Sequence, residues 1–85
     1  MEPILGQVQL FAFGFEPMGW ILCDGRTLNI QQNSALYSLL GTTYGGNGST
    51  TFGIPNLMNA NPVPAAGSYY NCYYIAVEGI YPSRY

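Results

Sequence analysis

The sequence predicts an α+β fold that is mostly β, with one short helix and long glycine-rich loops. Two stretches, residues 4–15 and 69–81, alternate their side chains with the period of two that is typical of strands. A third stretch, residues 33–41, places leucines at helical spacing between a start signal and a stop signal. At 85 residues, the chain is expected to form a single domain, residues 1–85, with a thin hydrophobic core.

The N-terminal stretch is expected to be a long strand. Pro17 and Gly19 end it, because proline removes a backbone donor and glycine permits a sharp turn. A strand over residues 4–13 would reach roughly 33 Å at about 3.3 Å per residue, further than its own domain. One face would carry Ile4, Val8, Leu10 and Ala12, and the other Gln7, Gln9, Phe11 and Phe13.

A short strand over residues 20–23 comes next, and the dipeptide Asp24-Gly25 favours a turn directly after it. Residues 20–28 are therefore expected to form either a hairpin or a tight corner. Asn33 then suits the N-cap of a helix, and Gly41 its C-cap. The side chains at helical spacing between these caps, in the one helix expected, are Ala35, Leu36, Leu39 and Leu40.

The stretch GTTYGGNGSTTF, residues 41–52, has the composition of a phosphate-binding loop. It contains no lysine or arginine, and the predicted helix precedes the loop instead of following it. We therefore expect no nucleotide binding. Residues 44–48 instead let the backbone bend where a Cβ would not fit, while Phe52 anchors the far end of the loop in the core.

Residues 58–68, rich in Asn, Pro, Ala and Gly, are expected to connect a core region, residues 1–57, to a C-terminal strand region, residues 69–85. Both faces of that strand are apolar, which favours a central position in a sheet. One face carries Tyr73, Ile75 and Val77, and the other carries Cys72, Tyr74 and Ala76.

Charged residues are scarce: they make up 7% of the chain, against about a quarter in most soluble domains. So little charge suits a surface that other subunits cover. With a net charge of −2 and two arginines, the chain lacks the positively charged surface that binds nucleic-acid phosphates. No apolar run reaches about 18 residues, so no membrane span is expected. The start, MEPILGQ, is no ordinary signal peptide, and we expect an extracellular protein released by lysis or an unconventional route.

Candidate catalytic groups are few. Without histidine, a serine or cysteine nucleophile lacks its usual base, and two cysteines fall short of the four ligands of a zinc site. No catalytic residue, metal or other cofactor is expected. Glu16 and Asp24 could form a carboxylate pair, yet each adjoins a turn residue, so Asp24 is expected to bond to local backbone. Cys23 and Cys72, expected near each other, are either a disulfide or two small buried apolar residues.

Aromatic residues are candidates for contacts. Trp20 could stack on a sugar, but a tryptophan between Gly19 and a strand is more often part of the core, and the same holds for Phe11, Phe13 and Phe15. Tyrosine combines a large contact area with a polar tip, which favours interfaces. At least half of the C-terminal tyrosines are expected to touch another subunit: Tyr69, Tyr70, Tyr73, Tyr74, Tyr81 and Tyr85.

Six short motifs follow one another along the chain: GQVQLF (6–11), PMGW (17–20), CDG (23–25), LYSLLG (36–41), YGGNG (44–48) and TFGIPNL (51–57). Their order and spacing resemble the phage tail collar domain family, known from short tail fibres and small bacterial proteins of the microcystin-dependent type. The end of the chain, IAVEGIYPSR (75–84), is similar to that family's last strand.

The chain departs from the family pattern in two places. Where the family usually continues from Pro-Asp-Leu into Arg-Gly-Arg, this chain has NLMNA (56–60), and residues 59–68 replace the long middle region of longer relatives. The resemblance implies a minimal tail-collar-like domain that serves as a structural or assembly module on an extracellular appendage. It carries over no catalytic residue.

The leading hypothesis is a non-enzymatic subunit that assembles with copies of itself into an extracellular filament or phage-tail-like appendage. Residues 4–15 contain neither charged residues nor proline, which on edge strands hinder pairing with another chain. A strand edge without them can pair with a strand of another subunit. We expect residues 4–11 to add head-to-tail to a neighbouring subunit near its residues 73–77. The alternative is a trimeric collar or adhesin module that binds a cell-surface glycan or receptor. The N-terminal interface residues would be Ile4, Gln7, Val8, Gln9, Leu10 and Phe11.

Overall fold

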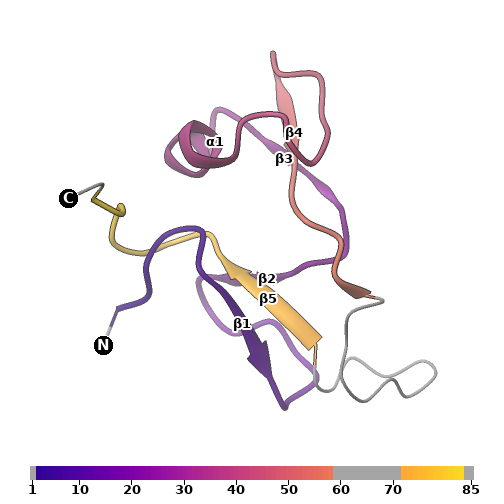
Figure 1. The fold of residues 1–85 in the computed structure, drawn as a ribbon, viewed down its shortest axis with the longest axis vertical. Helices are drawn as coiled ribbons and strands as arrows, with labels where there is room; N and C mark the ends of the chain where they lie inside the picture. The colour runs from indigo at the N-terminus through magenta and orange to yellow at the C-terminus, as the bar shows by residue number, and fades with distance from the viewer. Residues whose placement is uncertain (1, 59–71, 84–85) are drawn as a thin grey trace.

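The computed structural model describes residues 2–58 and 72–83, and these form two small antiparallel sheets and one helix (Figure 1). The three-stranded sheet and the two-stranded sheet lie in different halves of the fold, and the two ends of the chain lie on the same side. This architecture is the small, mostly β fold with one short helix that the sequence predicts. The elements are β1 (Val8–Phe11), β2 (Trp20–Leu22), β3 (Thr27–Asn29), α1 (Ser34–Leu40), β4 (Thr51–Gly53) and β5 (Cys72–Ala76).

Strand β5 is the centre of the three-stranded sheet, whose order is β1-β5-β2. Val8 and Ile21 both face Ile75 across the two antiparallel pairs. Both faces of β5 are covered, since Tyr74, Ile75 and other members of the strand are almost fully buried. The predicted central position is therefore confirmed. The strand is shorter than predicted: it ends at Ala76, residues 77–79 form a bend, and residues 69–71 lie outside the described residues.

The N-terminal strand is also shorter than predicted, and the expectation of a strand over residues 4–13 that outreaches its domain is wrong. The chain turns at residues 5–6, where the Gln7 N–H donates to the Ile4 carbonyl over 2.9 Å. Ile4 instead forms an isolated parallel bridge with Ile80, which ties the N-terminal segment to the C-terminal one. At the other end, β1 stops at Phe11 and residues 12–15 form bends. Side-chain alternation predicted the strand but could not locate the turns that shorten it.

The dipeptide Asp24-Gly25 lies in a corner and not in a hairpin. Strand β2 pairs with β5, whereas β3 pairs with β4, so the chain passes from one sheet to the other between them. Around the corner, the Leu57 N–H donates to the Cys23 carbonyl (2.9 Å) and the Gly25 N–H to the Pro55 carbonyl (3.3 Å). The pairing of β3 with β4 was not predicted, because three-residue strands are too short to show alternation.

Helix α1 lies where the sequence predicts it, with Asn33 as N-cap and Gly41 as C-cap. The Asn33 side chain makes no capping bond and donates instead to the Asn29 carbonyl. The Gly41 N–H closes the last turn on the Tyr37 carbonyl at 2.7 Å. Leu36, 1% exposed, points into the core.

The segment between α1 and β4 packs its backbone directly against β4. A Cβ added to Gly46 would lie 2.3 Å from the Phe52 Cα, and one added to Gly53 would lie 2.3 Å from the Tyr44 carbonyl oxygen. Phe52 itself is 0% exposed. Three backbone amides at the end of this segment are also occupied, because Asn47 Oδ1 accepts the N–H groups of Ser49, Thr50 and Thr51. An anion would have to displace that carbonyl oxygen.

Two hydrophobic clusters cover opposite faces of the three-stranded sheet. The larger one lies between this sheet, α1 and β4, and its buried members are Leu5, Cys23, Leu36, Phe52, Ile54 and Ile75. The smaller one consists of Leu22, Cys72 and Tyr74, with Phe11, Trp20 and Met58 packed on it. The first cluster is closed by the other half of the fold. The second underlies the face that carries the sites described below.

Candidate functional site

The two outer edges of the three-stranded sheet differ in their protection. On β2, the N–H of Leu22 donates to the Glu16 carboxylate (2.7 Å) and the N–H of Trp20 to the Pro17 carbonyl (3.0 Å), so this edge is already capped. On β1, the alternation of an antiparallel ladder turns the backbone groups of Val8 and Leu10 away from β5. Among the residues that the structure describes, no partner covers them. Strand β1 is therefore the open edge of the sheet.

The side chains along β1 are exposed and uncharged. Val8 and Leu10 are 39% and 38% exposed, and Gln9 between them is exposed as well. Ile4 and its bridge partner Ile80 add a second exposed apolar pair at the junction of the two chain ends. Gln7 and Phe11 are half-buried. The residues expected in the N-terminal interface are thus mostly accessible.

Residues 4–11 were expected to pair with residues 73–77 of a neighbouring subunit, but in the structure Val8–Phe11 pairs with Cys72–Ile75 of the same chain. Strand β5 has β1 on one side and β2 on the other, so neither of its edges is open to a neighbouring subunit. The target proposed for strand addition is therefore corrected. A neighbour can reach β5 only by displacing β1 or β2, whereas within the described residues the outer edge of β1 is accessible.

The tyrosines predicted at an interface differ in how exposed they are. Tyr74 is 1% exposed and belongs to the smaller cluster, so its assignment to an interface is wrong. Burial raises the pKa of its hydroxyl. Tyr73 is partly buried against the larger cluster. The hydroxyl of Tyr81 lies 2.8 Å from Ser38 Oγ. Because Tyr81 is 52% exposed, it remains accessible to a partner. Tyr69, Tyr70 and Tyr85 lie outside the described residues.

Four aromatic rings on one face of the sheet stack in a row. Phe11 contacts Trp20 edge-on with ring centroids 5.0 Å apart, Phe13 stacks on Phe11 at 5.0 Å, and Phe15 on Phe13 at 4.6 Å. The row leads away from the core: Phe11 and Trp20 are half-buried, whereas Phe15 is 65% exposed. The expectation that Phe15 is a core residue is therefore wrong.

Arg26 links the two carboxylates considered in the sequence. Its side chain donates to both oxygens of Asp24 at 3.0 Å and lies 3.1 Å from Glu16 Oε2. The Arg26 N–H also donates to Asp24 at 3.1 Å, which confirms that Asp24 bonds to local backbone. The side-chain bond from Arg26 lowers the pKa of Asp24, and the same bond raises the pKa of Arg26. Sequence reasoning overlooked Arg26, although it lies two residues after Asp24.

This ion network makes the stability of the fold depend on acidity. Because the pKa of Asp24 is lowered in the folded chain, its contribution is present above the unfolded pKa and is lost as the pH falls through the folded value. We expect Asp24→Asn to lower the free energy of unfolding by about 1 kcal/mol or less near pH 6, since exposed ion pairs contribute little. In urea titrations, the difference from wild type should shrink as the pH falls below the unfolded pKa and disappear once Asp24 is protonated in the folded chain. An undiminished difference in acid would contradict this role.

The cysteines take the second of the two arrangements left open. No disulfide joins Cys23, which directly follows β2, to Cys72, the first residue of β5. The two cysteines belong to clusters on opposite faces of the sheet. The Cys23 N–H donates to the carbonyl of Tyr73, the residue after Cys72 (3.0 Å). Burial, and secondarily the Asp24 charge, raises the pKa of Cys23 to about 11.

Cys23 is expected to resist thiol reagents in the folded protein. Near pH 8, a pKa of about 11 leaves only about one thiol in a thousand ionised, and the thiolate is the reacting form. In a Cys72→Ala chain, labelling of Cys23 by Ellman's reagent should be at least about 100-fold slower than in the same chain in guanidinium. Equal rates in the two solutions would show that Cys23 is not buried as described.

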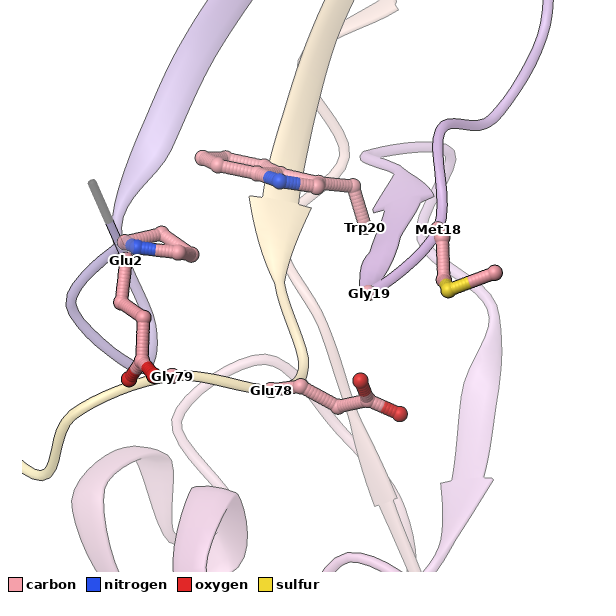
Figure 2. A pocket seen from close by; sticks show the side chains of 7 residues that line it. Glu2, Met18, Gly19, Trp20, Glu78 and Gly79 are labelled. Atoms are coloured by element: carbon pink, nitrogen blue, oxygen red, sulfur yellow. The ribbon is translucent and has the colours of Figure 1, made fainter.

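A groove crosses the aromatic face beside Trp20 and consists of two adjoining cavities of about 320 and 330 Å³. Both are lined by Glu2, Pro3 and Trp20. The first extends to Met18, Gly19, Glu78 and Gly79, and the second to Gln7, Gln9 and Phe11. Figure 2 shows the indole ring along one side of the first cavity, with Glu2 and Glu78 on the chain segments opposite it. We call these two cavities the Trp20 groove.

The walls of the Trp20 groove are held by backbone bonds. The Gly19 carbonyl accepts the N–H groups of Val77 (2.8 Å) and Glu78 (3.3 Å), which fixes Glu78 beside the start of β2. The Ile80 N–H donates to the Pro3 carbonyl at 2.9 Å and holds the N-terminal wall against the C-terminal one. The groove is therefore built from three segments that are far apart in the sequence.

Within residues 2–58 and 72–83, no group of three or more His, Cys, Asp or Glu side chains could hold a metal ion. No helix in the same residues is long and apolar enough to cross a membrane.

Comparison with protein families identifies the chain. The sequence model of the Phage Tail Collar Domain matches residues 6–62, about two thirds of the 85 residues. The chain belongs to the phage tail collar family. This family is a structural component of phage tail fibres. Comparisons with curated proteins and with solved structures gave no match.

The collar match spans β1 to β4 and α1 but ends before β5. The central strand of the three-stranded sheet thus comes from outside the matched region. Glu78, which lines the Trp20 groove, also lies outside the matched region. This collar domain therefore completes both its sheet and its groove with C-terminal residues.

Proposed function

We propose that this collar domain is a non-enzymatic structural subunit of an extracellular, tail-fibre-like appendage, and that copies of it join by strand addition at the open edge of β1. The collar family supports a structural role in tail fibres. The observation that supports strand addition at β1 is the difference between the two outer edges of the three-stranded sheet. Glu16 and Pro17 cap β2, whereas the outward backbone groups of Val8 and Leu10 have no partner among the described residues.

The composition favours contacts between copies of the chain. A partner strand laid along β1 would cover Val8 and Leu10 and would meet no charged residue between Glu2 and Glu16. Head-to-tail contacts build a filament when the rotation between copies does not close, and a trimer or other ring when it does. Both forms use the same edge.

Proline at position 10 tests this proposal. The Leu10 N–H points away from β5, so Leu10→Pro removes an outward donor while the bonds between β1 and β5 remain. We expect wild type to be oligomeric by light scattering and electron microscopy, and Leu10→Pro to be a folded monomer by circular dichroism. Leu10→Ala, which keeps the N–H, should still assemble. A wild-type monomer, or a folded Leu10→Pro chain that assembles like wild type, would refute joining at β1.

A second candidate function is that of a collar or adhesin module that binds a cell-surface glycan. The observation that favours it is the Trp20 groove, in which an aromatic ring lies beside carboxylate and amide side chains. Binding to a glycan array by a discrete oligomer would support this function. The two functions are compatible, since the groove and the outer edge of β1 involve different groups.

A further inference from the structure

We propose that the Trp20 groove binds a neutral sugar unit of a glycan, with the Trp20 ring as the stacking surface and Glu2 and Glu78 as the acceptors for its hydroxyl groups. This inference rests on the second candidate function above. It assigns that function to specific residues and to a class of sugar.

The size and shape of the groove suit a saccharide chain. Each of its two cavities has a volume near the lower end of the range for ligand pockets, roughly 300–1,000 Å³. Because both are lined by Trp20 and Glu2, they form one elongated site that passes the indole ring. A linear oligosaccharide could place successive units in the two cavities.

The indole ring is held in place but remains accessible. Phe11 supports it edge-on, with ring centroids 5.0 Å apart, and Trp20 is only half-buried. The indole N–H of Trp20, unlike its backbone N–H, has no hydrogen-bond partner among the described residues. An aromatic side chain with an apolar face and a free polar group can pack against the C–H face of a sugar ring and donate to one of its hydroxyls.

The polar groups of the groove are available as hydrogen-bond partners. Neither the Glu2 nor the Glu78 carboxylate pairs with any group in the described part of the chain, and a carboxylate can accept bonds from two neighbouring hydroxyls. Glu78 lies close to the start of β2: a Cβ placed on Gly19 would be 3.4 Å from its Oε2. In the second cavity, Gln9 adds an amide that accepts from Gln7 Nε2 and keeps its own NH₂ for a ligand.

The charge of the groove selects against acidic sugars. Its lining includes two carboxylates and no cation. The described cation, Arg26, is bound to Glu16 and Asp24. A sialic acid, a uronate or a phosphorylated sugar would be repelled, because no positive charge compensates its own. A neutral hexose with adjacent hydroxyls meets acceptors without that repulsion.

Fluorescence of Trp20 gives a direct test, because it is the single tryptophan of the chain. We would screen the full chain on an array of neutral, sialylated and uronate-bearing oligosaccharides, and titrate the strongest neutral ligand while recording tryptophan emission. We expect saturable binding of neutral oligosaccharides with a change in emission, and at least tenfold weaker binding of their acidic counterparts. The absence of binding to any neutral sugar, or a preference for acidic sugars, would overturn the proposal.

Variants assign the site. Glu78→Ala should weaken binding at least about tenfold, while Glu78→Gln, which keeps an acceptor, should weaken it less and reduce the discrimination against acidic sugars. Trp20→Phe keeps a ring against Phe11 but loses the indole N–H, and should also weaken binding. Tyr44→Ala removes a 48% exposed aromatic residue outside the groove and should bind like wild type. Unchanged affinity in a folded Glu78→Ala chain would refute the assignment.

The outcome can be separated from that of the assembly test. Wild type and Leu10→Pro would be titrated with the same sugar. Binding by both would show that the groove acts within one subunit. An assembled wild type that binds no sugar would refute the groove and leave the structural role intact.

Discussion

Gly46→Ala is expected to lower the free energy of unfolding by about 3 kcal/mol or more. The added Cβ would lie 2.3 Å from the Phe52 Cα and 2.6 Å from the Thr51 carbonyl oxygen, so it meets backbone that cannot rotate away. The residue also has φ +86°, a conformation that costs side chains other than glycine about 1–3 kcal/mol. Small domains have only about 5–15 kcal/mol of stability in total. Urea unfolding followed by circular dichroism measures the loss.

Gly41→Ala is the matched control for this substitution. Gly41 also has a positive φ, +57°, but an added Cβ would meet no atom within 4 Å. We therefore expect only the conformational cost, about 1–3 kcal/mol, without the added cost of a backbone clash. Equal losses of unfolding free energy in the two variants would show that the close approach of Gly46 to β4 adds nothing to the cost of the substitution.

Phe52→Ala is expected to destabilise the fold by about 3–5 kcal/mol, the range for removing a buried phenylalanine. Phe52 is 0% exposed, is part of the larger cluster and packs against Tyr37 with ring centroids 5.4 Å apart. Its loss would leave a cavity where α1 and β4 meet the three-stranded sheet. The measurement is the midpoint and slope of denaturant unfolding, with fluorescence of Trp20 as a second probe of the other sheet face.

Tyr44→Ala provides the comparison for Phe52→Ala. Tyr44 precedes the glycines that pack on β4, but its side chain is 48% exposed, so we expect a change of about 0.5 kcal/mol or less. If the loss in Phe52→Ala were as small as that in Tyr44→Ala, the larger cluster could not be the core that holds the two halves together.

Local signals in the sequence were sufficient for some elements. The cap residues Asn33 and Gly41 bracket α1 because helix ends depend on neighbouring residues. The apolar character of both faces of β5 predicted its central position, since only a strand covered on both sides tolerates it. Asp24 formed the local bond expected of an aspartate at a turn. For the helix and for Asp24 the deciding interactions lie within a few residues of the chain, and for β5 the signal is the composition of the strand itself.

Other features depend on contacts between distant segments. The length of β1 depends on a turn at residues 5–6 and on the bridge from Ile4 to Ile80, and its partner proved to be β5 of the same chain. Strands β3 and β4 become strands only by pairing with each other across α1. Alternation in a sequence indicates a strand and its faces, but it does not say which strand lies beside it or whether that strand belongs to the same subunit.

The sequence by itself therefore determined the family, the helix, the central strand and the scarcity of charge, because these follow from local pattern and composition. Only the tertiary structure decided which sheet edge is open and where the groove lies. Glu16 protects the edge of β2 from six residues away, and Glu2 and Glu78, from opposite ends of the chain, line the same cavity as Trp20. Such sites arise where the fold brings remote backbone and side chains together, and no short stretch of the sequence contains them.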